Sequence, residues 1–143
     1  MSINYYTEEC DYRLPAKMHT RRWLRAVAQS EGFRIGELNY IFCGSEHHRA
    51  MNVQYVGHDY YTDIITFDYS DHEEGYIAGD IFIDPETVAD NAAKLGTNSA
   101  EEIYRVVVHG VLHLCGQGDK TPEDEAMMHA KEDRYLALRS EIE

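Results

Sequence analysis

The sequence is short of cysteine and of long hydrophobic runs. Its three cysteines, Cys10, Cys43 and Cys115, are odd in number and widely spaced in a chain of 143 residues. That usage favours reduced thiols in the cytoplasm over a disulfide framework. No apolar run approaches the ~20 residues that span a bilayer, and the first residues lack the basic and apolar regions of a signal peptide. These absences predict a cytoplasmic protein with no membrane partner.

Basic residues are also scarce. The chain has 13 Lys and Arg residues and 26 Asp and Glu residues, which gives a net charge of −13. This balance weighs against a nucleic-acid partner, although charges are screened beyond about 8 Å in physiological salt, so that a local patch outweighs the total. The one concentrated basic surface lies on an amphipathic helix expected over residues 15–30. A solvated helix face explains it without any function, and contact with an RNA backbone is the alternative. Its basic residues are Lys17, Arg21, Arg22 and Arg25.

The length fits one domain, residues 1–143, with a hydrophobic content of 43% that is ordinary for a globular protein. β-rich runs predict strands at residues 3–6, 38–43, 62–67 and 76–84. Capping and periodicity predict helices at residues 15–30, 45–55, 85–95 and 99–114, and from 122 to near the C-terminus. This order predicts an α+β fold: a single four-stranded, mixed sheet packed with about five helices, and a metal site on the penultimate helix.

The stretch from His109 to Asp119 carries the residues around which we expect the chain to be organised. Histidines four positions apart on a helix project from the same face, so His109 and His113 can reach one metal ion. Gly116 stands where a helix ends, since glycine accepts the left-handed conformation. The chain can then turn back and offer Asp119 as a third ligand, with the fourth position left for water. Taken alone, a histidine pair with this spacing is more often two core side chains bonded to backbone carbonyls.

Two other metal chemistries share this ligand pattern. The spacing of positions 109, 113 and 119 is that of a metalloprotease zinc helix, but Gly110 stands where such an enzyme needs its glutamate base. Two histidines and one carboxylate also suit an iron oxygenase, although nothing else in the chain marks a cosubstrate site. Cleavage of a denatured protein would identify the first of these.

Three ordered blocks of residues resemble the YbeY family of bacterial rRNA maturation factors. The family hallmark H-G-x-L-H-L-x-G-x-D-H has the frame of residues 109–119. A second block is matched by Met51-Asn52-x-x-Tyr55, Asp59 and Thr62-Asp63-Ile64-Ile65-Thr66-Phe67, and a third by Gly79-Asp80-Ile81-Phe82-Ile83. The blocks keep the family's order.

The resemblance implies a zinc-dependent endoribonuclease that cuts single-stranded RNA in 16S rRNA 3′-end maturation and ribosome quality control. Its partners would be rRNA and the small ribosomal subunit, not DNA. One zinc ion per chain would be held by His109, His113 and Asp119. Because Asp119 replaces the third histidine of the family, iron or manganese would also be accepted. The catalytic base stays unassigned, with a metal-bound hydroxide as the leading candidate.

A second departure from the family concerns RNA contact. Val56 stands where the family has an arginine, and valine cannot pair with a phosphate. Arg49, on the same expected helix, is a candidate substitute. The departure leaves open an alternative function, a ribosome-assembly or RNA-binding factor whose metal is structural and which has little or no nuclease activity.

Overall fold

Within the residues that the structure describes, the chain forms one four-stranded sheet and five α-helices. The computed structural model describes residues 2–56 and 63–142. The strands are β1 (Ser2–Glu8), β2 (Arg34–Cys43), β3 (Ile64–Asp68) and β4 (Tyr76–Ile83). The helices are α1 (Lys17–Ser30), α2 (Ser45–Met51), α3 (Pro85–Leu95), α4 (Ser99–Leu114) and α5 (Pro122–Glu141), and a π-helical turn, η1 (Asn52–Val56), continues α2.

The sheet is mixed, with strand order β1-β2-β4-β3. β1 pairs parallel with β2, β2 pairs parallel with β4, and β3 lies antiparallel beside β4 at the edge. The three parallel strands therefore end at the same edge of the sheet. There the last residues of β1 and β2, Glu8 and Cys43, lie opposite each other.

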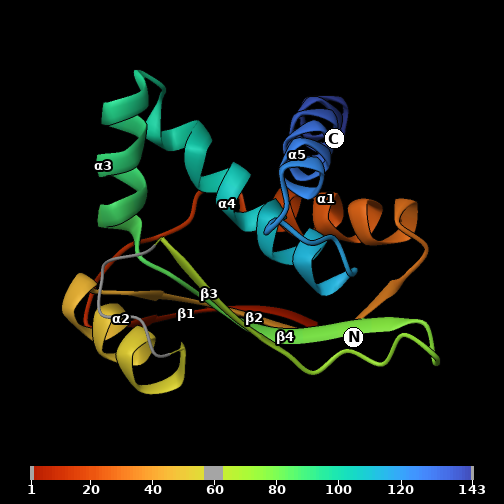
Figure 1. Cartoon of the computed structure of the whole chain (residues 1–143), viewed down its shortest axis with the longest axis horizontal. Helices are drawn as coiled ribbons and strands as arrows, with labels where there is room; N and C mark the ends of the chain where they lie inside the picture. The colour runs from red at the N-terminus through yellow and green to blue at the C-terminus, as the bar shows by residue number, and fades with distance from the viewer. Residues whose placement is uncertain (1, 57–62, 143) are drawn as a thin grey trace.

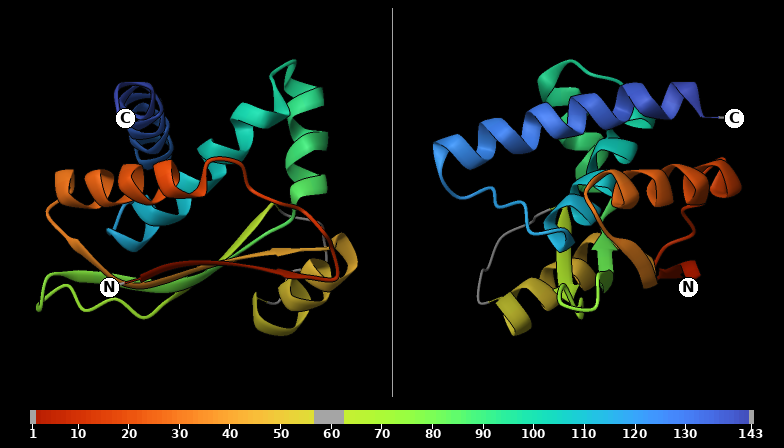
Figure 2. Two further views of the ribbon diagram at one scale, coloured as in Figure 1. Left: turned by 180° about the vertical axis from the view of Figure 1, so that it is seen from behind. Right: turned by 90° about the vertical axis from the view of Figure 1, so that its right-hand side faces the viewer.

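The helices cover mainly one face of the sheet (Figure 1). α1 contacts β2 and α4 contacts β3 and β4, whereas α5 packs on α1 and α4 as an outer layer. α2 lies at the other side, at one end of the sheet, as the views of Figure 2 agree. α5 therefore lies outside α1 and α4, and its contact with α4 forms the site described below.

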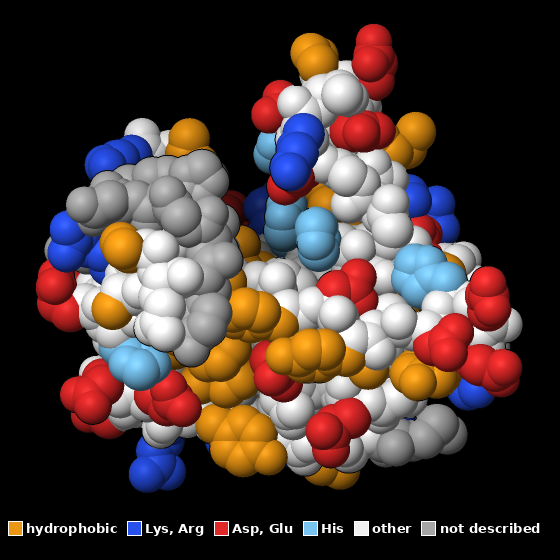
Figure 3. Space-filling model, turned by 60° about the horizontal axis from the view of Figure 1, so that its bottom comes forward, with side chains coloured by type: hydrophobic (Ala, Val, Ile, Leu, Met, Phe, Trp, Pro, Cys, Tyr) orange, Lys and Arg blue, Asp and Glu red, His pale blue; other side chains and the backbone are white. Residues whose placement is uncertain are grey.

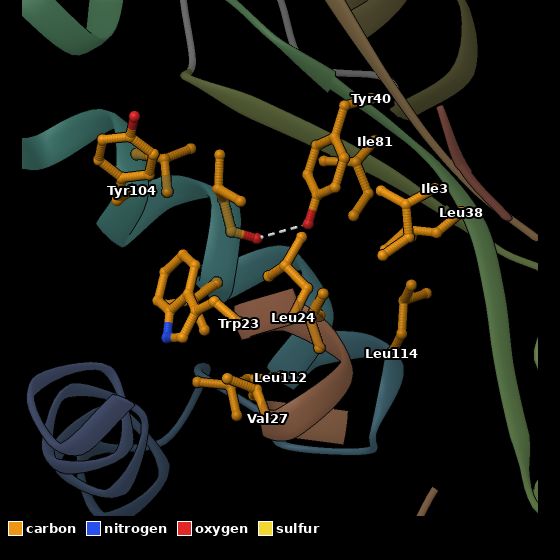
Figure 4. Close-up of a cluster of buried hydrophobic side chains, with 14 of the residues drawn as sticks. Ile3, Trp23, Leu24, Val27, Leu38, Tyr40, Ile81, Tyr104, Leu112 and Leu114 are labelled. Carbon is orange, nitrogen blue, oxygen red and sulfur yellow. Dashed lines mark hydrogen bonds between the residues drawn. The ribbon is translucent and has the colours of Figure 1, made fainter. Parts of the chain in front are cut away.

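The core lies between the sheet and helices α1 and α4 (Figure 4). Trp23 and Leu24 of α1 and Leu112 of α4 are fully buried there. The hydroxyl of Tyr40 on β2 donates a 2.8 Å hydrogen bond to the main-chain oxygen of Val107. Burial on this scale explains why α4 is so apolar, and it fixes the register of α4 over the sheet.

The predicted fold class and element order are confirmed, with corrections at several boundaries. The run Ser99-Ala100-Glu101-Glu102 predicts a capping box that begins at Ser99, but α4 is capped one residue earlier, by the side chain of Asn98, which accepts from the Ala100 amide. β2 begins at Arg34, four residues before the predicted start. The predicted third strand began at residue 62, which lies outside the described residues. Among the described residues, no helix is long and apolar enough to cross a membrane.

Candidate metal centre

The end of α4 is shaped by Gly116, as the sequence predicts. Gly116 has φ +99°. Its amide donates to the oxygen of His113, and the amide of Gln117 donates to the oxygen of Leu112, each at 3.0 Å. This pair of bonds is the Schellman arrangement, in which a left-handed residue ends the helix and reverses the chain. The reversal carries Asp119 back along α4 toward His109.

His109 lies between two carboxylates. Its Nε2 atom is 3.3 Å from Oδ2 of Asp119, and its Nδ1 atom is 2.7 Å from Oε2 of Glu132 on α5. A histidine that donates Nδ1–H to a carboxylate keeps the lone pair of Nε2 for a metal ion. The ring is thus oriented as a metal ligand whose metal-facing nitrogen points at a second oxygen donor.

Glu132 is held in place by a cluster of charged side chains. It is 4% exposed, and its Oε1 atom accepts a 3.1 Å bond from Nη1 of Arg105, one turn before His109 on α4. Arg105 also donates a 2.7 Å bond to the exposed Asp133. A buried carboxylate needs such a partner, since an unpaired charge would be costly. Arg105 therefore holds the Glu132 carboxylate in place beside His109.

The electrostatics of the site follow from this packing. Burial by itself lowers the pKa of His109, but the hydrogen bond and charge of Glu132, together with the charge of Asp119, raise it above its ordinary value. Burial also raises the pKa of Asp63, an effect that the neighbouring His109 partly offsets. The surroundings thus favour a positive charge at His109, whether a proton or a cation supplies it.

His113 lies one turn further along α4 and is exposed. Among the described side chains, the potential ligand atoms of His109, His113 and Asp119 do not all come within 4.8 Å of one another. The structure therefore brings together His109 and Asp119, whereas the recruitment of His113 to the same cation stays a prediction.

A small pocket of about 180 Å³ opens beside His109. Asp63 and Ile64, which precede and begin β3, line it, as does His129 of α5, whose Nδ1 atom is 3.5 Å from Glu132. Figure 3 shows histidine side chains gathered at a hollow on this face, with acidic and basic side chains beside them. Asp63 belongs to the second sequence block and His109 to the family hallmark, so residues from two of the three blocks line the same pocket.

Sequence reasoning missed Glu132 and Arg105, and it left out His129 because histidines on a helix surface are common. Glu132 lies 23 residues beyond His109 in the chain, and no local spacing marks it as a partner. The one available signal was an acid among the buried positions of α5, between Met128 and Tyr135. An acid at such a position needs a partner.

In the third sequence block, residues 79–83, the glycine is explained by packing and not by chemistry at the metal centre. A Cβ atom on Gly79 would lie 2.5 Å from the carbonyl oxygen of Phe67 and 3.1 Å from Leu114. A side chain there would push β3 and α4 away from β4. Gly79 therefore sets how closely the end of α4 approaches the sheet.

Two predicted RNA-contact features are only partly described. Of the second block, Asp59 and Thr62 lie outside the described residues, as do the side chains of Tyr55 and Val56. The Arg49 guanidinium lies 4.0 Å from the carboxylate of Glu46. Its role as a substitute arginine stays a prediction.

The basic face of α1 is present, but only part of it is exposed for contact with RNA. Lys17, Arg22 and Arg25 are exposed. Arg21 is half-buried, and its Nε donates a 2.9 Å bond to the oxygen of Ile3. That contact gives Arg21 a structural role. A solvated face remains the first interpretation of these basic residues, and RNA binding remains the alternative.

Comparison with known proteins agrees with this architecture. A solution structure of a Thermotoga maritima protein superposes with a TM-score of 0.67 over 94% of this chain and 88% of that one, at 22% identity, which shows a shared fold. The sequence model described as Endoribonuclease YbeY matches residues 3–139. Two proteins named Endoribonuclease YbeY, from Parabacteroides distasonis and Bacteroides fragilis, are 46% and 45% identical over 143 and 141 residues. The first alignment covers 99% of this chain and 98% of the relative, the second 99% and 100%. The chain therefore belongs to the YbeY family of endoribonucleases.

Proposed function

We propose that this chain is a metal-dependent endoribonuclease that cuts single-stranded RNA in 16S rRNA 3′-end maturation and ribosome quality control. It would work in the cytoplasm on rRNA and the small ribosomal subunit. One zinc ion per chain would be held by His109, His113 and Asp119, and iron or manganese are the alternatives that a carboxylate ligand permits. The observation that carries this proposal is the His109 ring held between Asp119 and Glu132.

The donor set fits such an ion. Two imidazoles and one carboxylate match a catalytic zinc site with an open fourth position. When bound, the ion would supply a Lewis acid and an acidified water at neutral pH.

The protein's own groups prepare this chemistry. Glu132 accepts a hydrogen bond from Nδ1–H of His109, which leaves the lone pair of Nε2 free to bind a metal ion. Arg105 donates a hydrogen bond to Glu132 and so fixes the position of its carboxylate. Asp119 adds a negative oxygen donor next to that nitrogen, and the neighbouring pocket offers space beside the site.

RNA cleavage tests the proposal. The purified protein and its His113→Ala variant are incubated with zinc and a single-stranded fragment from the 3′ end of 16S rRNA. The same fragment annealed to its complement serves as the duplex control. We expect the wild type to cut the single strand and to spare the duplex, and His113→Ala to cut neither.

Two results would overturn the proposal. Equal cleavage by both proteins would point to a contaminating nuclease. RNA that is bound but never cut, by a protein that melts when its metal is removed, would instead support the assembly or RNA-binding factor.

A further inference from the structure

Three potential metal ligands meet at the edge of the sheet where the parallel strands end. Glu8 is the last residue of β1, Cys43 is the last residue of β2, and His47 lies in the first turn of α2. A carboxylate oxygen, the Cys43 sulfur and a ring nitrogen of His47 lie within 4.8 Å of one another. Across residues 2–56 and 63–142, no other group of three such side chains is this close. None of the three belongs to the His109 site.

The backbone holds these strand ends together. The Gly44 amide donates a 3.0 Å bond to the oxygen of Glu8, and a Cβ atom on Gly44 would overlap the carbonyl oxygen of Glu9. Glu9 itself has φ +57°, a left-handed conformation that a glutamate adopts only at a cost. Glu8 and Cys43 are thus brought together by main-chain geometry, so a ligand would find them already in place.

The surroundings favour a cation. A hollow of about 1010 Å³ adjoins the cluster, between the starts of α2 and α3, and His47 and Gly44 form part of its wall. The carboxyl edge of parallel strands is where α/β sheets commonly bind ligands. Four acids line the hollow against one lysine, so its field attracts cations and repels RNA phosphates. These charged residues are Glu9, Glu46, Glu86, Asp90 and Lys94.

The environment of Cys43 keeps its thiol protonated as long as no metal ion is bound. Its side chain is fully buried, and burial first, then the charge of Glu8, raises its pKa to about 12. Without a metal it is a neutral thiol and a poor nucleophile, which weighs against a redox role. A bound cation would displace the thiol proton. The thiolate and Glu8 would then balance the two positive charges of a divalent ion.

Another potential ligand near Cys43, the Asp84 carboxylate, already has structural partners. Asp84 is buried and caps α3, where it accepts from the amides of Glu86 and Thr87 and from the Thr87 hydroxyl. Its carboxylate is therefore occupied by structural bonds. That leaves three protein ligands at this edge.

We propose that Glu8, Cys43 and His47 form a second metal site, separate from the His109 centre, for a divalent ion of the zinc and cobalt type. One sulfur, one nitrogen and one oxygen ligand suit such borderline ions better than magnesium or calcium. The fourth position is left for water. The competing explanation is a plain surface ion pair, since Nε2 of His47 is 2.7 Å from Oε2 of Glu8 and both side chains are partly exposed.

Cobalt tests the site directly, because thiolate-bound Co²⁺ absorbs in the near ultraviolet and the His109 centre contributes no thiolate. Co²⁺ is titrated into the reduced full-length protein carrying His113→Ala, which removes the predicted ligand of the other centre. We expect a charge-transfer band that saturates at one equivalent. Adding Cys43→Ser should abolish the band, and Glu8→Gln or His47→Gln should weaken cobalt binding at least about tenfold, the low end of effects seen around metal sites.

The matched controls are the other two cysteines. Cys10→Ser and Cys115→Ser should each keep the band. The proposal is overturned if no band forms, if it survives Cys43→Ser, or if it disappears with Cys10 or Cys115 instead. Circular dichroism checks folding. Should Cys43→Ser unfold, the Glu8 and His47 variants decide, because both change partly exposed side chains, and unchanged cobalt affinity in both would refute the site.

Discussion

Replacing Glu132 by glutamine tests whether this residue prepares His109 for a metal. The carboxylate accepts from Nδ1 of His109 at 2.7 Å and from Arg105 at 3.1 Å. An amide has one acceptor and one donor group, so it cannot accept both bonds. If the amide oxygen faces Arg105, its N–H₂ group faces Nδ1. The ring proton then moves to Nε2, the nitrogen needed by the metal.

The expected loss follows from this geometry. Removing the partner of a metal-bound histidine typically weakens metal affinity about 10- to 100-fold, which corresponds to about 1.4–2.7 kcal/mol. We expect Glu132→Gln to weaken zinc binding by that factor, measured by competition with a chromophoric chelator. Urea denaturation in the presence of a chelator should show a loss of about 1–3 kcal/mol in the free energy of unfolding, because a buried charge-assisted bond is lost.

Asp133→Asn is the matched control. Asp133 bonds the same arginine at 2.7 Å but is largely exposed. Since a surface ion pair contributes about 0–1 kcal/mol, the control should bind zinc like the wild type. The reasoning is refuted if Glu132→Gln binds zinc as tightly as the wild type, or if Asp133→Asn weakens binding equally.

Three further changes test the fold. Although partial burial raises the pKa of Glu31, the hydrogen bonds it accepts, chiefly one of 2.7 Å from Lys131, bring it below its ordinary 4.5. The resulting stabilisation is present above pH 4.5 and is lost as the pH falls through the lowered pKa. Glu31→Gln should therefore lower the urea midpoint at pH 7 more than at pH 4. Gly79→Ala should cost about 1–3 kcal/mol in urea denaturation, since its Cβ would meet the oxygen of Phe67; an unchanged midpoint would contradict this. Tyr40→Phe should cost about 1 kcal/mol in the same assay, because a buried bond to a main-chain oxygen of α4 is lost; an equally stable variant would show that the bond contributes nothing net.

Features that depend on neighbouring residues were predictable. Asp84 before Pro85 predicts the start of α3, and the side chain caps it as expected. Gly116 predicts the end of α4, and its positive φ confirms it. Such signals act within one helical turn, so sequence order alone reveals them. The inner face of α2 and of the following η1 turn was not predictable in this way. The sequence predicts Ala50, Met51 and Val53 on the buried side, but Ala50 and Val53 are exposed and Met51 is half-buried, whereas His48 and Asn52 are buried. A short polar helix has too weak a period to reveal its inner face.

What the sequence determined by itself is the order of elements, the family, and the pairing of His109 with Asp119 across a glycine turn. Only the tertiary structure decided that Glu132 approaches His109 from α5, and that Glu8, Cys43 and His47 share one edge of the sheet. The physical reason is that these contacts depend on strand order and on helix packing. Both are set by burial summed over the whole core, so no local stretch of sequence specifies which distant side chains become neighbours.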